Sequence, residues 1–232
     1  MSEEIILSVR ELTKTYASGS RSLTVLNAVS FDVKKGSTCA VVGPSGSGKT
    51  TLLGLCAGLD KPSSGSVSLN GVVLDDLTED EKAEVRNRHV GFIFQSFNLM
   101  PTLTALENIM IPMELRGNRD AKARALELLE TVGLADRGKH YPAQLSGGEQ
   151  QRISIARAFA NKPSILFADE PTGNLDGETG AAIEDLIFEL NRDAGTTLVL
   201  VTHDLELANK TDRVITMKNG KLHTDKATEA AI

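Results

Sequence analysis

The chain has 232 residues, with a formal net charge of −6 and 41% hydrophobic residues. This length allows one large α/β domain or a core with a subdomain, and the negative charge argues against a protein whose main task is to grip nucleic acid. No apolar run approaches the length of a membrane span, and the acidic start Met1-Ser2-Glu3-Glu4 is unlike a signal peptide, so we expect a cytoplasmic chain.

The first third of the chain is typical of strands and turns. Predicted strands lie at 5–12, 23–33, 38–42, 66–69 and 72–74. The last two are joined by Asn70-Gly71, a strong hairpin signal. Thr78 and Glu81 form a capping-box pattern that predicts a short helix, and a buried strand follows. The two cysteines, Cys39 and Cys56, lie in apolar segments and are interpreted as buried fillers.

Helical periodicity begins near residue 103. Predicted helices lie at about 103–113, 121–132, 149–160 and 179–191. Predicted strands lie at 165–168, 197–201 and 214–217, the last turned by Asn219-Gly220. This order predicts one domain over 1–232, with a mostly parallel α/β core and an antiparallel N-terminal β subdomain (1–95 and 146–232) and an α-helical insertion at 96–145.

The strand at 38–42 runs into the motif G-x-x-x-x-G-K-[ST], which is Gly43-Pro44-Ser45-Gly46-Ser47-Gly48-Lys49-Thr50. Glycines let successive N–H groups wrap around phosphate oxygens, and the following helix presents its positive end to the same anion. Lys49 adds charge near the β- and γ-phosphates, and the Thr50 hydroxyl can ligate Mg²⁺. A chance match in a Gly/Ser turn is the alternative, which the flanking strand and helix disfavour.

A second apolar strand ends in Asp169 and Glu170. Adjacent side chains on a strand point to opposite faces. Asp169 can therefore hold Mg²⁺, while Glu170 faces the space where a nucleophilic water would stand and can accept its proton. Alone, this pair would equally suit a solvated acidic turn. Alongside the phosphate loop, we interpret it as catalytic.

A third motif, Leu145-Ser146-Gly147-Gly148-Glu149, precedes a predicted helix. A serine and two glycines at a helix start offer N–H groups to an anion, although an ordinary serine N-cap is the alternative. These residues resemble the signature motif of ATP-binding-cassette (ABC) ATPases. In that family the signature of one subunit closes on the γ-phosphate held by the phosphate loop of its partner. Glu149 departs from the commonest signature, which ends in Gln, and we expect altered tuning without loss of function.

The resemblance covers essentially the whole chain. Gln95 matches the Q-loop, His203 the switch histidine, Tyr16 the aromatic that stacks on adenine, and Leu175-Asp176 the D-loop between the two sites of the dimer. The resemblance implies catalytic roles for Glu170, His203 and Gln95. It implies Mg²⁺ ligation by Thr50, Gln95 and Asp169, and ATP binding by Tyr16, the eight residues of the phosphate loop and Thr51. Alone, Tyr16 and His203 would more often be structural.

A narrower likeness lies in the sequences ADEPTGNLD at 168–176 and FQSFNL at 94–99, which resemble the group of LolD, the MacB ATPase domain and YbbA. The stretches at 101–108 and 142–152 look most like YbbA. The resemblance implies a homodimer on ATP binding, beneath a MacB/FtsX-like permease on the cytoplasmic face of the inner membrane. It implies export or extraction of lipoprotein, drug or other hydrophobic cargo, and no nucleic acid. Phe97 and Met100 are candidate exposed anchors for the permease.

Other functions fit the sequence less well. A DNA-repair ABC ATPase would carry a long coiled coil, and a ribosomal one would carry two cassettes; neither feature is present in the sequence. A non-hydrolysing ATP-binding clamp would be favoured by loss of Lys49 or Glu170, and both residues are present. A GTPase is disfavoured because no [NT]-K-x-D motif occurs.

Overall fold

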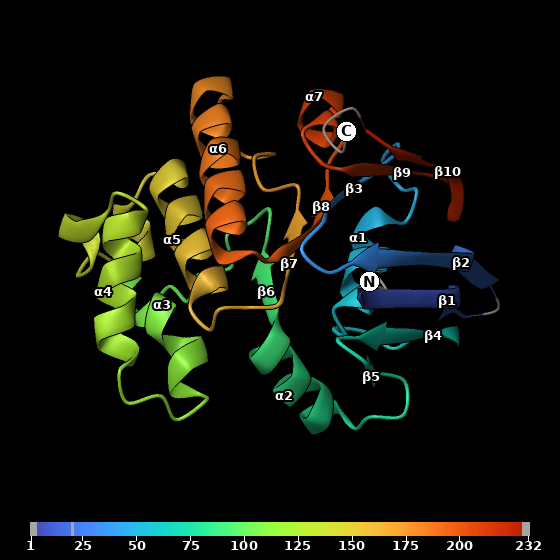
Figure 1. Ribbon diagram of the computed structural model, residues 1–232, viewed down its shortest axis with the longest axis horizontal. Coiled ribbons are helices and arrows are strands. Elements are labelled where there is room, and N and C mark those ends of the chain that lie inside the picture. The colour runs from blue at the N-terminus through green and yellow to red at the C-terminus, as the bar shows by residue number, and fades with distance from the viewer. Residues whose placement is uncertain (1–3, 20, 229–232) are drawn as a thin grey trace. The chain divides into compact units, whose positions relative to one another are not determined.

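The computed structural model describes residues 4–19 and 21–228. The chain forms two compact units, one made of the chain up to Arg86 together with the part from Thr196 onward, and the other made of Asn87–Gly195. Figure 1 labels the elements of both. Helix α2 (Glu79–His89) runs across the boundary between them in the sequence.

The first unit begins with an antiparallel sheet of four strands in the order β2-β1-β4-β5. Its strands are β1 (Ile5–Ser18), β2 (Arg21–Lys34), β4 (Ser64–Leu69) and β5 (Val72–Val73). Leu7 and Val9 of β1 are fully buried, with the half-buried Ser8 between them and the exposed Arg10 after them. The turn between β4 and β5 holds Asn70 and Gly71 at φ 49° and 79°, the left-handed backbone that the Asn-Gly signal predicted.

The same unit contains a parallel arrangement in which β3 (Thr38–Val42) lies between β8 (Thr197–Val201) and β9 (Arg213–Lys218). Strand β10 (Lys221–Ala227) closes the edge antiparallel to β9. Helix α1 (Lys49–Cys56) packs on β2, β4 and β8, and the short helix α7 (Leu205–Asn209) packs on β3. The continuous apolar runs of β3 and β8 are typical of strands buried on both faces.

Both cysteines are buried and free, as predicted. Burial raises the pKa of Cys39 to about 12 and raises that of Cys56 as well. They therefore behave as small apolar side chains of β3 and α1.

The second unit pairs β6 (Val90–Ile93) with β7 (Ile165–Asp169) in parallel. Its helices are α3 (Ala105–Glu114), α4 (Ala121–Thr131), α5 (Gly147–Phe159) and α6 (Gly177–Ala194), with two 3₁₀ turns, η1 (Ala135–Arg137) and η2 (Pro142–Gln144). Helix α3 packs on α4 and α5, and α5 packs on β6 and α6. The ring of Phe92 on β6 stacks on that of Phe94, just after the strand, with centroids 4.1 Å apart.

The predicted α/β fold class is confirmed, and the differences are local. Helix α5 begins at Gly147, two residues before the predicted 149, because Ser146 is its N-cap. Helix α7 and both 3₁₀ turns were not predicted, since three to five residues are too few for helical periodicity to register. Among the described residues, none of the helices has the length and apolarity needed to span a membrane.

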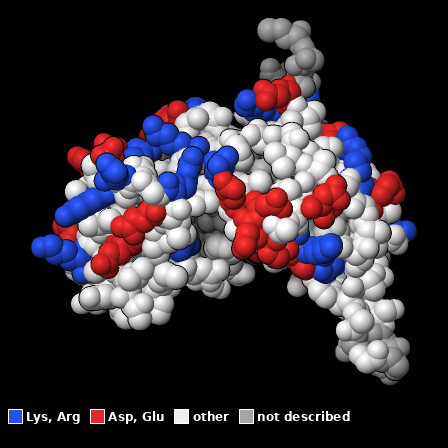
Figure 2. Space-filling model, turned by 90° about the horizontal axis from the view of Figure 1, so that it is seen from below, with Lys and Arg blue, Asp and Glu red and all other residues white. Residues whose placement is uncertain are grey.

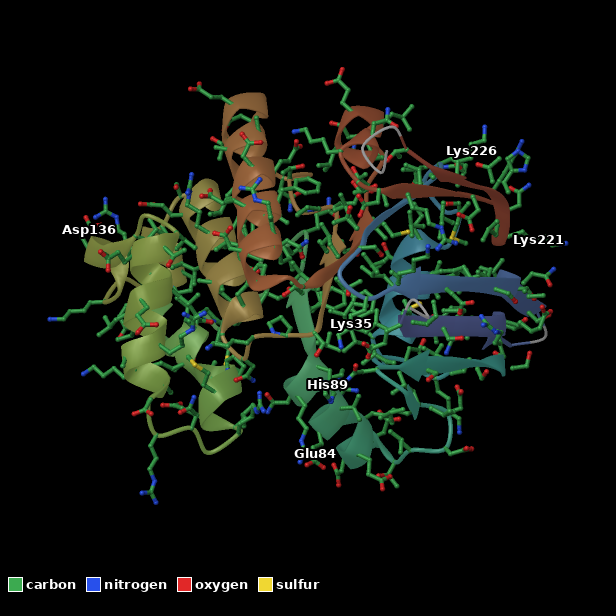
Figure 3. The ribbon with its side chains drawn as sticks, viewed as in Figure 1. Lys35, Glu84, His89, Asp136, Lys221 and Lys226 are labelled. Atoms are coloured by element: carbon green, nitrogen blue, oxygen red, sulfur yellow. The ribbon has the colours of Figure 1, made fainter. Side chains whose placement is uncertain are left out.

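Charged side chains of both signs cover the face drawn in Figure 2, and acidic ones gather there in a dense group. This view from below looks onto the side where α2 lies in Figure 1. The first turn of α2 carries Glu79, Asp80 and Glu81, which suit the positive end of a helix dipole. Figure 3 labels Glu84 on the same helix.

Candidate functional site

The loop from Gly43 to Gly48 joins β3 to α1 and lies close to other backbone segments of the same unit. Gly43 has φ 152°, and a Cβ there would lie 2.3 Å from the Met217 carbonyl oxygen. Gly48 has φ 98°, and a Cβ there would lie 2.8 Å from the Val25 carbonyl oxygen. Only glycine fits these two positions, so the motif glycines are required by the shape of the loop as well as by ligand approach.

The N-terminus of α1 is an open anion site. Its N-cap Gly48 makes no side-chain capping bond, and the first turn carries no acidic residue. Lys49 is 7% exposed, and its Nζ donates to the carbonyl oxygens of Gly43 at 2.8 Å and Pro44 at 3.3 Å. The buried Ser47 Oγ lacks a hydrogen-bond partner among the described residues. Unused donors, a helix dipole and a fixed cation together suit a polyphosphate.

Tyr16 is held by a charged network on β1. Its hydroxyl donates to Asp60 at 3.1 Å, and Lys14 Nζ lies 4.9 Å from its ring centroid. Lys14 also donates to Asp60 at 2.8 Å and to the Lys61 carbonyl oxygen at 2.6 Å. Burial raises the pKa of Asp60, but the hydrogen bonds from Lys14, the Lys61 N–H and Tyr16 outweigh burial and hold this pKa below its ordinary value. Tyr16 is 43% exposed, so it can still stack on a ligand.

His203 follows β8 and is exposed. Its neighbours are fixed on both sides, because the Asp204 N–H donates to Thr202 Oγ1 at 3.0 Å, and Asp204 caps α7 by accepting from the Glu206 N–H at 2.7 Å. The short helix α7 thus anchors the segment that carries the histidine.

The acidic pair in the second unit lies across the end of a strand. Strand β7 ends at Asp169, and Glu170 has φ 44°, in the left-handed region. The direction of Glu170 is therefore set by a turn. A left-handed backbone at a residue other than glycine is a strain that occurs preferentially at functional sites.

The turn after Glu170 contacts the segment of Gln95. The Gly173 N–H donates to the Glu170 carbonyl oxygen at 3.0 Å, and Asn174 Nδ2 donates to the Gln95 carbonyl oxygen at 2.9 Å. A Cβ on Gly173 would lie 3.0 Å from Gln95 Nε2. The structure therefore brings Gln95 next to the turn that carries Glu170.

The D-loop and the signature also meet within this unit. Asp176 caps α6 by accepting from the Thr179 N–H at 3.0 Å, a bond that lowers the pKa of Asp176. A Cβ on Gly147 would lie 3.4 Å from Leu175, and one on Gly148 would lie 2.7 Å from Thr179. A larger residue at Gly148 would therefore push against Thr179 in the first turn of α6, whereas a Cβ at Gly147 would only make van der Waals contact with the D-loop.

Ser146 is the N-cap of α5 and belongs to a complete capping box. Its Oγ accepts from the Glu149 N–H at 3.2 Å, and Glu149 Oε2 accepts from the Ser146 N–H at 2.8 Å. Glu149 also pairs with Arg137, whose Nε donates to Oε1 at 2.9 Å. The N–H of Ser146, the hydrogen bond from Arg137 and the serine hydroxyl lower the pKa of Glu149, so it is a carboxylate at neutral pH.

The segment after Gln95 is held by α5. Phe97 and Asn98 both have left-handed backbones, with φ 60° and 49°. Arg157 donates to their carbonyl oxygens at 2.8 Å and 2.6 Å, an arrangement that no sequence pattern had indicated. Of the two candidate anchors, Met100 is 51% exposed, whereas Phe97 is only partly exposed.

The predicted site residues thus fall into two sets. The first unit contains Tyr16, the phosphate loop with Thr50 and Thr51, and His203. The second contains Gln95, Asp169, Glu170, the signature and the D-loop.

Comparison with known proteins fits this geometry. Residues 26–173 match the family model described as ABC transporter. The chain is 54% identical to the ABC transporter ATP-binding protein YbbA of Escherichia coli K12 over 97% of this chain and 100% of the relative. It is 48% identical to the lipoprotein-releasing system ATP-binding protein LolD of Idiomarina loihiensis over 96% and 98%.

Solved structures agree. The ATP-binding cassette MJ0796, in a dimeric post-hydrolysis state bound to ADP and Pi, superposes with a TM-score of 0.89 and 40% identity over 96% of this chain and 98% of that one. A second dimeric structure of MJ0796, a bacterial ABC transporter cassette, gives the same TM-score at 41% identity over the same shares of the two chains. The chain therefore belongs to the ABC transporter family. It is an ATP-binding protein of the YbbA and LolD type, and by class an ATPase.

Proposed function

We propose that this chain is the ATP-hydrolysing subunit of a bacterial transporter, and that two copies close head-to-tail around two ATP molecules to drive a membrane permease. The observation that carries this proposal is the open start of α1, with the buried Lys49 and two sterically required glycines. The dimeric MJ0796 cassettes support the paired arrangement.

Each proposed site uses residues of both copies. One copy supplies Tyr16 against adenine, the phosphate loop with Thr51 around the phosphates, and Gln95 and His203 near the γ-phosphate. Glu170 accepts a proton from the attacking water. The other copy supplies Ser146, Gly147 and Gly148 as donors to the γ-phosphate, flanked by Leu145 and Glu149. Leu175 and Asp176 lie between the two sites.

We propose Mg²⁺ as the metal of this site. The hydroxyl of Thr50, the carboxylate of Asp169 and the amide oxygen of Gln95 are hard oxygen donors that suit it. The described residues contain no cluster of three or more His, Cys, Asp or Glu side chains that could hold a metal, which fits an ion carried mainly by nucleotide phosphates. When bound, Mg²⁺ would neutralise charge developing on the phosphates.

The partner we propose is a MacB/FtsX-like permease that holds the chain on the cytoplasmic face of the inner membrane. The proposed cargo is lipoprotein, drug or another hydrophobic molecule, a class supported by the lipoprotein-releasing LolD relatives. We propose that the whole chain acts as one ATPase domain, with a core of 1–95 and 146–232 and a helical insertion at 96–145.

Hydrolysis by the purified chain tests the first part of this function. The wild type should hydrolyse ATP with Mg²⁺, and Lys49→Ala should neither bind nor hydrolyse it, because the fixed charge of the loop is lost. A wild type that binds ATP tightly but never turns it over would favour the ATP-binding clamp.

Docking tests the second part. Met100→Ser should weaken recruitment to membranes that contain the permease, because an exposed apolar contact is lost. Leu126→Ser is the matched control, since Leu126 is 47% exposed in the same unit. Both variants should keep basal ATPase activity. Equal recruitment of the two variants would remove Met100 from the docking surface.

A further inference from the structure

The start of α5 carries an internal anion. Glu149 is the third residue of the helix, and its carboxylate accepts from the Ser146 N–H at 2.8 Å. An acidic residue here stabilises the helix through its dipole. The same negative charge repels a phosphate approaching Ser146 and Gly147, which is the approach that the proposed function requires. A glutamate at this position therefore favours the helix and opposes the ligand.

Arg137 offsets that charge. Its Nε donates to Glu149 Oε1 at 2.9 Å, and its Nη1 forms an ion pair with Asp136. The Arg137 and Glu149 side chains are 37% and 25% exposed, so water screens this pair only in part, whereas Asp136 is 74% exposed and contributes less. Figure 3 shows the labelled Asp136 at the outer edge of this unit, on η1. The 3₁₀ turn η1 thus places a cation at the start of the signature helix α5.

We propose that Arg137 is a positioning residue for nucleotide closure: by holding and neutralising the Glu149 carboxylate, it lets the Ser146 end of α5 accept the γ-phosphate bound to a second copy of this chain. Arg137 acts through Glu149 and does not touch the nucleotide. This inference rests on the proposed function, because it assumes that the signature closes on ATP held by a partner.

Replacing Glu149 by glutamine tests the negative charge separately from the capping hydrogen bond. A capping box accepts either Glu or Gln at its third helical position, so Glu149→Gln keeps the hydrogen bond to the Ser146 N–H and removes the charge. The arginine would then face the phosphate uncompensated. Glu149→Gln should therefore lower the ATP concentration needed for closure by about threefold.

The test is a double-mutant cycle in the Glu170→Gln background, where ATP-bound dimers should accumulate. Dimer fraction against ATP concentration is measured by light scattering for four proteins, the reference chain, Arg137→Gln, Glu149→Gln and the double variant. Arg137→Gln should raise the ATP concentration for half-closure by about three- to tenfold, and the double variant should return close to the reference. Binding of a fluorescent ATP analogue to the monomer should be the same in all four proteins.

A matched control is Arg124→Gln. Arg124 pairs with Glu127 at 3.2 Å in the same unit and is 32% exposed, but it lies on α4, away from the α5 start. This variant should close like the reference. Equal weakening by Arg124→Gln and Arg137→Gln would show a general effect on the helices and would overturn the proposal.

The possible outcomes distinguish the proposed function from the proposed role of Arg137. A reference chain that binds ATP but never dimerises would contradict the proposed function. A reference that closes normally, with Arg137→Gln unchanged or with no rescue in the double variant, would overturn the inference alone. If Arg137→Gln fails to fold, Glu149→Gln decides: easier closure supports the role of the charge, and unchanged closure contradicts it.

Discussion

Two helix starts in this chain, those of α1 and α5, are both suited to phosphate but are built in opposite ways. The start of α1 is capped by Gly48 with no side-chain bond and no acidic residue, and Lys49 supplies the charge. The start of α5 is capped by Ser146 and contains Glu149, so the Ser146 N–H already serves an internal carboxylate. A site that binds nucleotide by itself can remain open. A helix start that meets the nucleotide only when two copies close can be stabilised by its own carboxylate in the absence of ligand. That carboxylate then competes with the phosphate for the helix start.

The largest effect should come from the group that handles the proton. Glu170→Gln keeps the size of the side chain and removes its basicity, so turnover should fall by roughly 10²–10⁴-fold while ATP still binds. Size-exclusion chromatography with ATP should show an accumulated dimer. Turnover near the wild-type value would remove Glu170 from the role of base.

A second change separates the two helix starts. Ser146→Arg should weaken ATP-driven dimerisation by roughly 10²-fold, because the bulk of the new side chain enters the partner's site, where overpacking costs about 1–3 kcal/mol, and the serine cap of α5 is lost at a cost of about 1 kcal/mol. The α1 start is untouched, so binding of a fluorescent ATP analogue to the monomer should persist. Loss of that binding would mean that the two starts do not act separately.

A smaller effect should follow from loosening the segment after Gln95. Arg157→Met removes two hydrogen bonds to the left-handed residues Phe97 and Asn98, and we expect stability to fall by about 2–4 kcal/mol. Hydrogen exchange should increase at 97–99 and turnover should fall, with nucleotide binding retained. Arg152→Met serves as the control, since Arg152 also lies on α5 but donates to the carbonyl oxygen of Val132, the C-cap of α4. Equal exchange at 97–99 in both variants would argue against the clamp.

The smallest effect concerns the ring of Tyr16. Asp60→Asn weakens the contacts that orient Tyr16 and should lower ATP affinity by about threefold, while affinity for tripolyphosphate stays unchanged. The depressed pKa of Asp60 gives a sign for pH. The contribution of Asp60 to the free energy of unfolding is present above its unfolded-state pKa of about 4. It is lost as pH falls through the lower pKa that Asp60 has in the folded state. An equal loss of tripolyphosphate affinity would place the effect in the phosphate loop instead.

Features that depend on neighbouring residues could be predicted from the sequence, whereas contacts between residues far apart in the chain could not. Strands, the phosphate loop and the Thr78 cap were predicted because each depends on neighbouring residues, and the structure contains them. The direction of Glu170 was predicted from strand alternation, but the strand ends at Asp169 and Glu170 lies in a left-handed turn, so alternation does not determine its direction. Arg157 and Asp60 act on residues far along the chain, at Phe97 and Tyr16, so no local pattern marks them. Lys14, by contrast, could have been predicted as a neighbour of Tyr16, because residues two apart on a strand lie on the same face.

The central claim is that each catalytic site combines the α1 start of one copy with the α5 start of the other. Mixing Lys49→Ala with Ser146→Arg tests it most directly, because each variant alone should be inactive. In the mixed dimer, the intact loop of the Ser146→Arg copy faces the intact signature of the Lys49→Ala copy. The account predicts that mixing restores ATP hydrolysis, with at most one working site per dimer. A mixture as inactive as its separate components would contradict it.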